Sequence, residues 1–146
     1  MIRATLDTNV LASSAIARVG GIAVLFSRWR ADQFELVVSD HIVSERARVL
    51  HKPYFAARLD VQDRAEFLAL VAGDATVVAI AEPIPDVVSD PADNLVLATA
   101  LSAGVPYLVS GDRELQRLAA YPGNQDPLSS RVYRHPRRRV DPFWRV

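Results

Sequence analysis

The chain has 146 residues, half of them hydrophobic, which fits one domain with a sizeable buried core. Its 17 basic and 17 acidic residues cancel, so the net charge neither favours nor excludes a polyanionic partner. There is no cysteine, which excludes a disulfide framework, a thiolate zinc site and a cysteine nucleophile. We find no secretory signal and no apolar run of the ~20 residues that a membrane span needs, so we expect a cytoplasmic protein.

The first part of the chain predicts a strand followed by two helices. Residues 2–6 form a short apolar run that stops at Asp7-Thr8-Asn9, a combination typical of turns and helix N-caps. We expect one helix from Val10 to the neighbourhood of Gly20, and a second from Ile22 to Ala31.

The middle of the chain predicts a second strand and more helix. Residues 34–38 are largely apolar, and Ser39-Asp40 can cap the helix that follows them. Glu45 lies in the early turns of that helix, which Pro53 ends. Two further helical segments follow, at residues 54–59 and 61–72.

The last part alternates strands and helices again. Residues 75–80 are rich in β-branched side chains and predict a third strand, after which Pro83 and Pro85 favour a loop. Pro91 suits the first turn of a helix that ends at Gly104. The segments expected beyond it are a strand at 106–109, a helix at 113–119, a loop at 121–127 and a last strand starting at 132–133.

Short, nearly all-apolar strands that alternate with helices are typical of a parallel sheet covered on both faces. We therefore expect a single α/β domain over residues 1–146, with a divergent, arginine-rich segment at 121–146. Its arginines near the end are Arg131, Arg134, Arg137, Arg138, Arg139 and Arg145, against the single acid Asp141. They form either a solvated terminus or a patch that contacts phosphate.

Four acidic residues stand where strands end or helices begin: Asp7, Glu45, Asp93 and Asp112. The carboxyl ends of parallel strands line one crevice, so Asp7 and Asp112 should converge there. Carboxylates so close repel one another unless a cation lies between them, and hard divalent cations prefer oxygen ligands. One or two Mg²⁺ or Mn²⁺ ions would acidify a bound water and stabilise charge on a phosphoryl oxygen. The pattern predicts a metal-dependent site for phosphodiester hydrolysis.

Some of these acids also have a plainer interpretation. Glu45 can pair at the surface with a neighbouring arginine, Arg46 or Arg48. Asp90 is the better cap for the helix that starts after it, which leaves Asp93 to face outward from the first turn. One shared site, however, explains all four acids with a single cause.

Other catalytic chemistries find little support in the sequence. It contains no Gly-x-Ser-x-Gly elbow, no Gly-Lys-Ser or Gly-Lys-Thr phosphate loop, and no Gly-x-Gly-x-x-Gly after the first strand. His41, His51 and His135 lack the spacing of metal ligands and are interpreted as surface or capping residues.

Four short motifs occur in an order and spacing found in one known family. They are Leu6-Asp7-Thr8-Asn9-Val10, Ser39 with Glu45 and Val49-Leu50, Asp90-Pro91-Ala92-Asp93-Asn94, and Leu108-Val109-Ser110-Gly111-Asp112. With them the chain resembles the PIN-domain family, and within it the VapC-like ribonucleases of bacterial toxin–antitoxin systems. The resemblance covers residues 2–118.

The resemblance implies a three-layer α/β/α sandwich with a central parallel sheet of four to five strands. It implies a Mg²⁺- or Mn²⁺-dependent endoribonuclease, a hydrolase of phosphodiester bonds in single-stranded RNA, acting as the toxin of a type II pair. Its partners would be a small cognate antitoxin and a second copy in a homodimer. The family's catalytic, metal-binding acids carry over to Asp7, Glu45, Asp93 and Asp112, with Thr8, Asn9 and Asp90 as auxiliary residues.

Substrate binding and two alternatives remain to be considered. Arg113 is the candidate for substrate phosphate, because arginine can contact two phosphate oxygens at once. A catalytically inactive PIN-like module that binds RNA or protein would have the same fold, but the retention of all four acids speaks against it. A phosphoacceptor receiver domain needs a lysine on a late strand, whereas the only lysine, Lys52, precedes Pro53.

Overall fold

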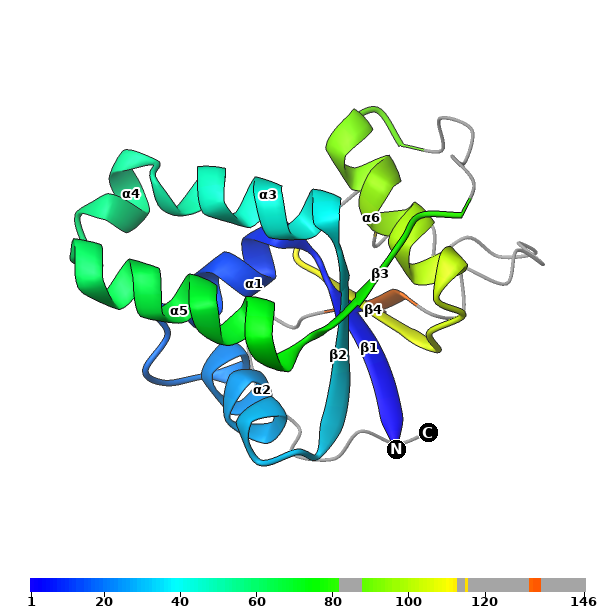
Figure 1. Cartoon of the computed structure of the whole chain (residues 1–146), viewed down its shortest axis with the longest axis horizontal. Helices are drawn as coiled ribbons and strands as arrows, with labels where there is room; N and C mark the ends of the chain where they lie inside the picture. The colour runs from blue at the N-terminus through cyan, green and yellow to red at the C-terminus, as the bar shows by residue number, and fades with distance from the viewer. Residues whose placement is uncertain (82–87, 113–114, 116–131, 135–146) are drawn as a thin grey trace.

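The computed structural model describes residues 1–81, 88–112, 115 and 132–134 (Figure 1). Its strands are β1 (Ile2–Leu6), β2 (Phe34–Ser39), β3 (Thr76–Val78), β4 (Tyr107–Ser110) and β5 (Val132–Arg134). Its helices are α1 (Thr8–Ser14), α2 (Gly21–Arg30), α3 (Asp40–Leu50), α4 (Pro53–Ala56), α5 (Val61–Asp74) and α6 (Pro91–Ser102).

The strands form one parallel sheet in the order β3-β2-β1-β4-β5. In the central strand β1, Ile2 aligns with Phe34 of β2, and Leu6 aligns with Val109 of β4. At the far side Ser110 aligns with Arg134, which confirms the last strand expected from the sequence. Because all strands run the same way, their carboxyl ends share one side of the sheet, hereafter the carboxyl edge.

Helices cover both faces of the sheet, so the predicted three-layer arrangement is confirmed. In Figure 1, α1 to α5 lie on one side of the strands and α6 lies on the other. The chain moves outward from β1 to β2 to β3, and then back across the sheet through α6 to β4. Since crossovers between parallel strands are right-handed, opposite directions of travel put the connecting helices on opposite faces.

Burial on both faces explains the nearly all-apolar strands. Leu36, Val37 and Val38 are consecutive in β2 and therefore point alternately to the two faces, yet all three are buried. No helix within the described ranges is long and apolar enough to span a bilayer.

The observed elements differ from the predicted ones in extent. Helix α1 ends at Ser14, well before Gly20, and β3 has only three residues. The predicted helix at 113–119 and loop at 121–127 lie outside the described residues, apart from the buried Leu115.

Arg46 of α3 lies in the interior, with 1% of its surface exposed. One guanidinium nitrogen, Nη2, donates to the carbonyl of Leu68 in α5 at 3.3 Å, whereas Nε and Nη1 are buried without a hydrogen-bond partner among the described residues. Burial lowers the pKa of Arg46 to about 10. A buried charge that lacks a counter-ion destabilises the fold, so Arg46 is a cost that packing of α3 on α5 has to offset.

We predict that Arg46→Met raises the free energy of unfolding, because an apolar side chain of similar length removes the buried charge. The expected gain is ~1–4 kcal/mol in urea denaturation. Arg18→Met, at an exposed position, is the control and should change stability by no more than ~0.5 kcal/mol. A clear loss of stability in Arg46→Met would show that the guanidinium stabilises the fold.

Candidate active site

Asp7 follows β1 directly and caps α1, as the sequence predicts. Its Oδ1 accepts from the backbone N–H of Val10 at 2.7 Å, and its own N–H donates to the carbonyl of Val109 at 2.9 Å. The second bond extends the pairing of β1 with β4 by one residue. With only 3% of its surface exposed, Asp7 is held at the carboxyl edge between these two strands.

Ser110, the last residue of β4, joins Asp7 to Asp112. Its hydroxyl donates to Oδ2 of Asp7 and accepts from the backbone N–H of Asp112 at 3.0 Å. Asp112 is in turn fixed by its Oδ1, which accepts from the N–H of Leu115 at 3.0 Å. We call these three residues the Asp7–Ser110–Asp112 group.

The electrostatics of this group are dominated by the burial of Asp7, which raises the pKa of its carboxyl. Hydrogen bonds from Ser110 and from the backbone N–H groups of Val10 and Gly111 lower the pKa, while the negative charge of Asp112 raises it further. The net shift is upward, so the donors around Asp7 do not fully replace the water that burial removes.

The group lies where connections leave the sheet in opposite directions. The chain goes from β1 through α1 and α2 to β2 on one side, whereas it reaches β4 on the other side through α6. Ligands of open α/β sheets bind in the crevice at such a switch point, outside the carboxyl ends of the strands. The N-terminus of α1 also points there and adds a partial positive charge.

Ser39 brings two more helices to the same edge, on the other side of Asp7. Continuing the register of β1 with β2 sets Ser39 beside Asp7. The Ser39 hydroxyl accepts from the N–H of Ile42 at 3.4 Å at the start of α3, and from Oγ1 of Thr99 in α6 at 2.7 Å. Helices α3 and α6, which cover opposite faces, therefore meet at the carboxyl edge (Figure 1).

Glu45, on α3, is paired with Arg48. The two carboxylate oxygens accept from Nη2 of Arg48 at 2.5 and 2.6 Å, and this pairing raises the pKa of Arg48. The Arg48 side chain is 73% exposed and that of Glu45 is 18% exposed. Of the two arginines considered from the sequence, the surface one is thus the partner, and Arg46 is buried.

The start of α6 carries Asp90 and Asp93. Asp90 is the cap, because its Oδ1 accepts from the N–H of Ala92 at 2.9 Å, and Asp93 lies in the first turn, partly buried. Asn94 is buried, and its side-chain amide bonds both the N–H and the carbonyl of Val88, at 3.0 and 2.8 Å. These bonds fix the segment that leads into the helix.

The donors of the Asp7–Ser110–Asp112 group are carboxylate and hydroxyl oxygens, which fit a hard divalent cation in kind. In the described ranges, however, no three His, Cys, Asp or Glu side chains lie close enough together to hold a metal ion. The structure thus brings Asp7 and Asp112 together, and the membership of Glu45 and Asp93 in the site stays a prediction. Next to Asp7, Thr8 is buried and Asn9 is exposed, whereas Arg113 lies outside the described residues.

Sequence analysis missed the role of hydroxyl groups at this edge. Ser110 was treated as part of a turn, although it links two of the predicted acids, and Thr99 was interpreted only as a small residue of the helix that follows Asp93. A hydroxyl in the last position of a strand, two residues before an acid, is the signal that identifies Ser110.

We predict that Asp7→Asn stabilises the protein at neutral pH when a chelator is present. Because the pKa of Asp7 is raised on folding, the folded state holds its proton more tightly, and the stability this gives is lost as the pH rises through the folded-state pKa. Asparagine keeps an acceptor for Val10 and does not ionise. The variant's advantage in urea denaturation should therefore shrink as the pH is lowered, and a difference independent of pH would refute the assignment.

Comparisons with known proteins agree with this geometry. Residues 3–114 match the family model described as PIN domain. The fold is similar to the crystal structure of VapBC2 from Rickettsia felis bound to a DNA fragment from their promoter, with a TM-score of 0.56 and 11% identity over 80% of this chain and 92% of that one. It is also similar to VapC20 of Mycobacterium tuberculosis, a Sarcin-Ricin loop cleaving toxin, with a TM-score of 0.51 and 13% identity over 72% and 86% of the two chains.

No curated protein matches the sequence. At such low identities the structural likeness shows the fold alone, whereas the family model spans most of the sequence. The chain therefore belongs to the PIN domain family.

Proposed function

We propose that this protein is a metal-dependent endoribonuclease that hydrolyses single-stranded RNA, and that it is the toxin of a type II toxin–antitoxin pair. The observation that carries the proposal is the Asp7–Ser110–Asp112 group, a buried carboxylate linked to a second acid at the switch point of the sheet. PIN domains are generally divalent-metal-dependent nucleases, and the two similar solved structures concern VapC toxins and their complexes.

The cation ligands in this proposal are Asp7, Asp112, Glu45 and Asp93. Asp7 and Asp112 already lie together, and the raised pKa of Asp7 reflects a carboxylate that a cation would stabilise in its charged form. Glu45 is held only by its pair with the exposed Arg48, and pairs of that kind are worth about 0–1 kcal/mol. It can therefore exchange this partner for a cation at little cost.

Asp93 and Glu45 are carried by helices that meet beside Asp7. Helices α3 and α6 are tied at the carboxyl edge by the hydrogen bond from Thr99 to Ser39. This supports a shared site fed from both faces of the sheet. We propose Mg²⁺ or Mn²⁺ as the ion, one or two per site, because the candidate ligands are all oxygen atoms.

When bound, such a cation supplies a more acidic water and neutralises charge that develops on the phosphoryl group. The chain's own residues then have separate tasks. Ser110 and the N–H groups of Val10 and Gly111 orient the Asp7 carboxylate, so that it does not have to be fixed during the reaction. Arg113 binds substrate phosphate, with the later arginines as further candidates. Because uncompensated acids repel RNA, the cation has to bind before the substrate.

A small antitoxin and a second copy of the chain are the proposed protein partners. VapBC2 is a toxin–antitoxin complex in the solved structure that resembles this one. We propose that the antitoxin of this chain is encoded alongside it. An arginine from the antitoxin could take the cation's position at Asp7 and stop the reaction without covering the whole surface. The expected homodimer would leave the carboxyl edge of each subunit accessible.

The acids are tested by replacement with their amides. We expect Asp7→Asn and Asp93→Asn to lower Mn²⁺-dependent cleavage of single-stranded RNA by more than ~100-fold, since even residues behind metal ligands contribute ~10–100-fold. Asp63→Asn is a matched control for Asp93→Asn, because both acids lie three residues after a capping aspartate, Asp60 in α5 and Asp90 in α6. The control should cleave as the parent does.

Two results would overturn this assignment. If folded Asp7→Asn and Asp93→Asn cut RNA as well as the parent, these acids are not the site. If the parent shows no metal-dependent cleavage but still binds RNA or a protein partner, the alternative of a catalytically inactive PIN-like binding module is correct.

Ser110→Ala tests the hydroxyl that links the two acids. We expect cleavage to fall ~10–100-fold, as for residues that orient metal ligands. The loss of a donor to Asp7 should also move the acidic limb of the pH–rate profile to higher pH, because the hydrogen bond from Ser110 lowers the pKa of Asp7. Ser44→Ala, at an exposed position of α3, is the control. An unchanged profile in Ser110→Ala would rule out an orienting role.

A further inference from the structure

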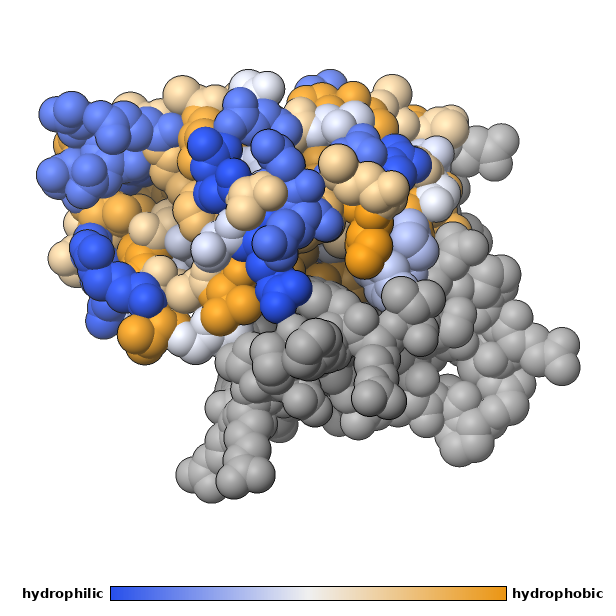
Figure 2. Space-filling view, turned by 90° about the horizontal axis from the view of Figure 1, so that it is seen from below, coloured by the Kyte–Doolittle hydropathy of each residue, from blue (hydrophilic) through white to orange (hydrophobic). Residues whose placement is uncertain are grey.

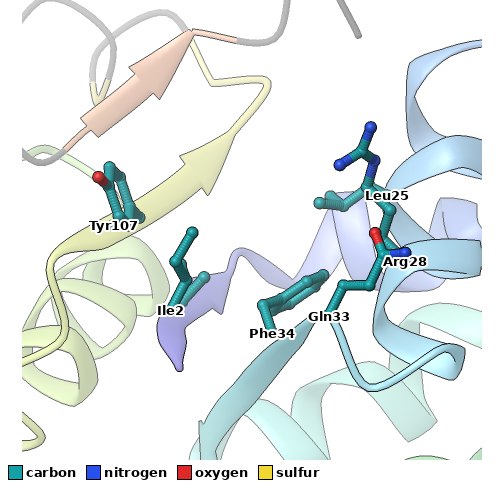
Figure 3. Close-up of a pocket in the computed structure, with 7 residues that line it drawn as sticks. Ile2, Leu25, Arg28, Gln33, Phe34 and Tyr107 are labelled. Atoms are coloured by element: carbon teal, nitrogen blue, oxygen red, sulfur yellow. The ribbon is translucent and has the colours of Figure 1, made fainter. Parts of the chain in front are cut away.

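A hollow lies at the end of the sheet opposite to the Asp7–Ser110–Asp112 group. It is lined by the first residues of three strands, Ile2 of β1, Phe34 of β2 and Tyr107 of β4. Figure 3 shows Ile2 between the rings of Phe34 and Tyr107, with Leu25 of α2 above them. We call this site the amino-edge hollow.

The amino-edge hollow is apolar and partly open. Besides the three strand residues, Ala4 and Leu25 line it, and the exposed Gln33 lies at its rim. Its volume is about 60 Å³, several times what one water molecule needs, but it offers few polar partners for water. Ile2 is 39% exposed. An apolar hollow of this kind is an unfavourable surface to leave in contact with solvent.

The hollow exists because the helical cover of this face stops there. Among the described helices, α2 packs on β2, and the chain reaches β4 through α6 on the opposite face. The side of β1 and β4 that faces α2 is therefore incompletely covered near the start of the strands. Figure 2, seen from this end of the molecule, shows hydrophobic side chains at the surface among hydrophilic ones.

The sequence contains one segment suited to cover it. Residues 135–146 lie outside the described part of the structure and follow β5. They are rich in arginine, but they include the adjacent aromatic pair Phe143-Trp144. Phe and Trp side chains each bury ~150–250 Å² when they pack, so an exposed pair has a strong tendency to find an apolar site.

We propose that Phe143 and Trp144 dock into the amino-edge hollow of the same chain. The length of the segment permits it. Arg134, at the end of β5, aligns with Ser110 at the carboxyl edge, so the chain has to return along the sheet to reach Ile2. Five-residue strands such as β1 span ~17 Å, whereas the nine residues from Arg134 to Phe143 extend to ~30 Å.

Tethering favours this occupant over a separate molecule. A segment attached by a short linker has an effective concentration in the millimolar range, which lets even a weak apolar contact form. Docking also anchors the far end of the segment that carries Arg137, Arg138 and Arg139, so these arginines are held between the carboxyl edge and the hollow. The inference does not depend on nuclease activity.

Tryptophan fluorescence tests the proposal, because the chain has two tryptophans and Trp29 is buried in α2. In a Trp29→Phe background Trp144 is the single reporter. We expect blue-shifted emission and protection from acrylamide in the full chain. Adding Ile2→Glu should shift the emission to the red and abolish the protection. Val24→Glu is the matched control, since Val24 is 38% exposed and lies outside the hollow, and it should leave Trp144 protected.

A second variant guards against a folding defect in Ile2→Glu. Phe143→Ser leaves the hollow intact and should also expose Trp144. Quenching of Trp144 as efficient as that of a free peptide, or protection that survives both Ile2→Glu and Phe143→Ser, would overturn the proposal. Protection that is lost on dilution would do so as well, because it would identify a second copy of the chain as the occupant.

Discussion

A buried carboxylate at the end of the central strand is the constraint on which the rest of the structure depends. Asp7 caps α1, extends the pairing of β1 with β4 and accepts from Ser110, so strand, helix and neighbouring strand are all fixed through one residue. Its raised pKa shows that these bonds do not fully offset burial beside Asp112. Arrangements of this kind cost stability and are concentrated at functional sites. A cation that binds there would turn the cost into binding energy.

The topology delivers the other candidate residues to the same edge. Because the connections reverse direction at β1, α3 and α6 approach from opposite faces and are joined by the hydrogen bond between Thr99 and Ser39. Glu45 and Asp93 ride on these two helices. The opposite end of the sheet has no such polar convergence and instead carries the apolar hollow around Ile2. The two ends of the sheet thus have distinct chemistry, one for a cation and RNA and one for hydrophobic docking.

Local chemistry was readable from the sequence, and long-range packing was not. The caps Asp7, Ser39 and Asp90 follow from side chains that bond N–H groups two or three residues on, so they are visible in short motifs. Helix α6 is apolar on nearly all sides, so its periodicity gives no direction. Leu95 and Leu101 were expected in the core and are 36% exposed. The interior position of Arg46 depends on α5, and the role of Ser110 depends on the register of β1 with β4, which no local pattern reveals.

Cation binding itself is the most direct test of the central claim that Asp7 and its neighbours form a metal site. Thermal unfolding of the parent should shift to higher temperature as Mn²⁺ is titrated in, because a ligand that binds only the folded state stabilises it in proportion to the logarithm of its concentration. In Asp7→Asn the Mn²⁺-dependent shift should be lost, while Asp63→Asn should retain it. Equal shifts in the parent and in Asp7→Asn would contradict the account, since the ion would then bind elsewhere.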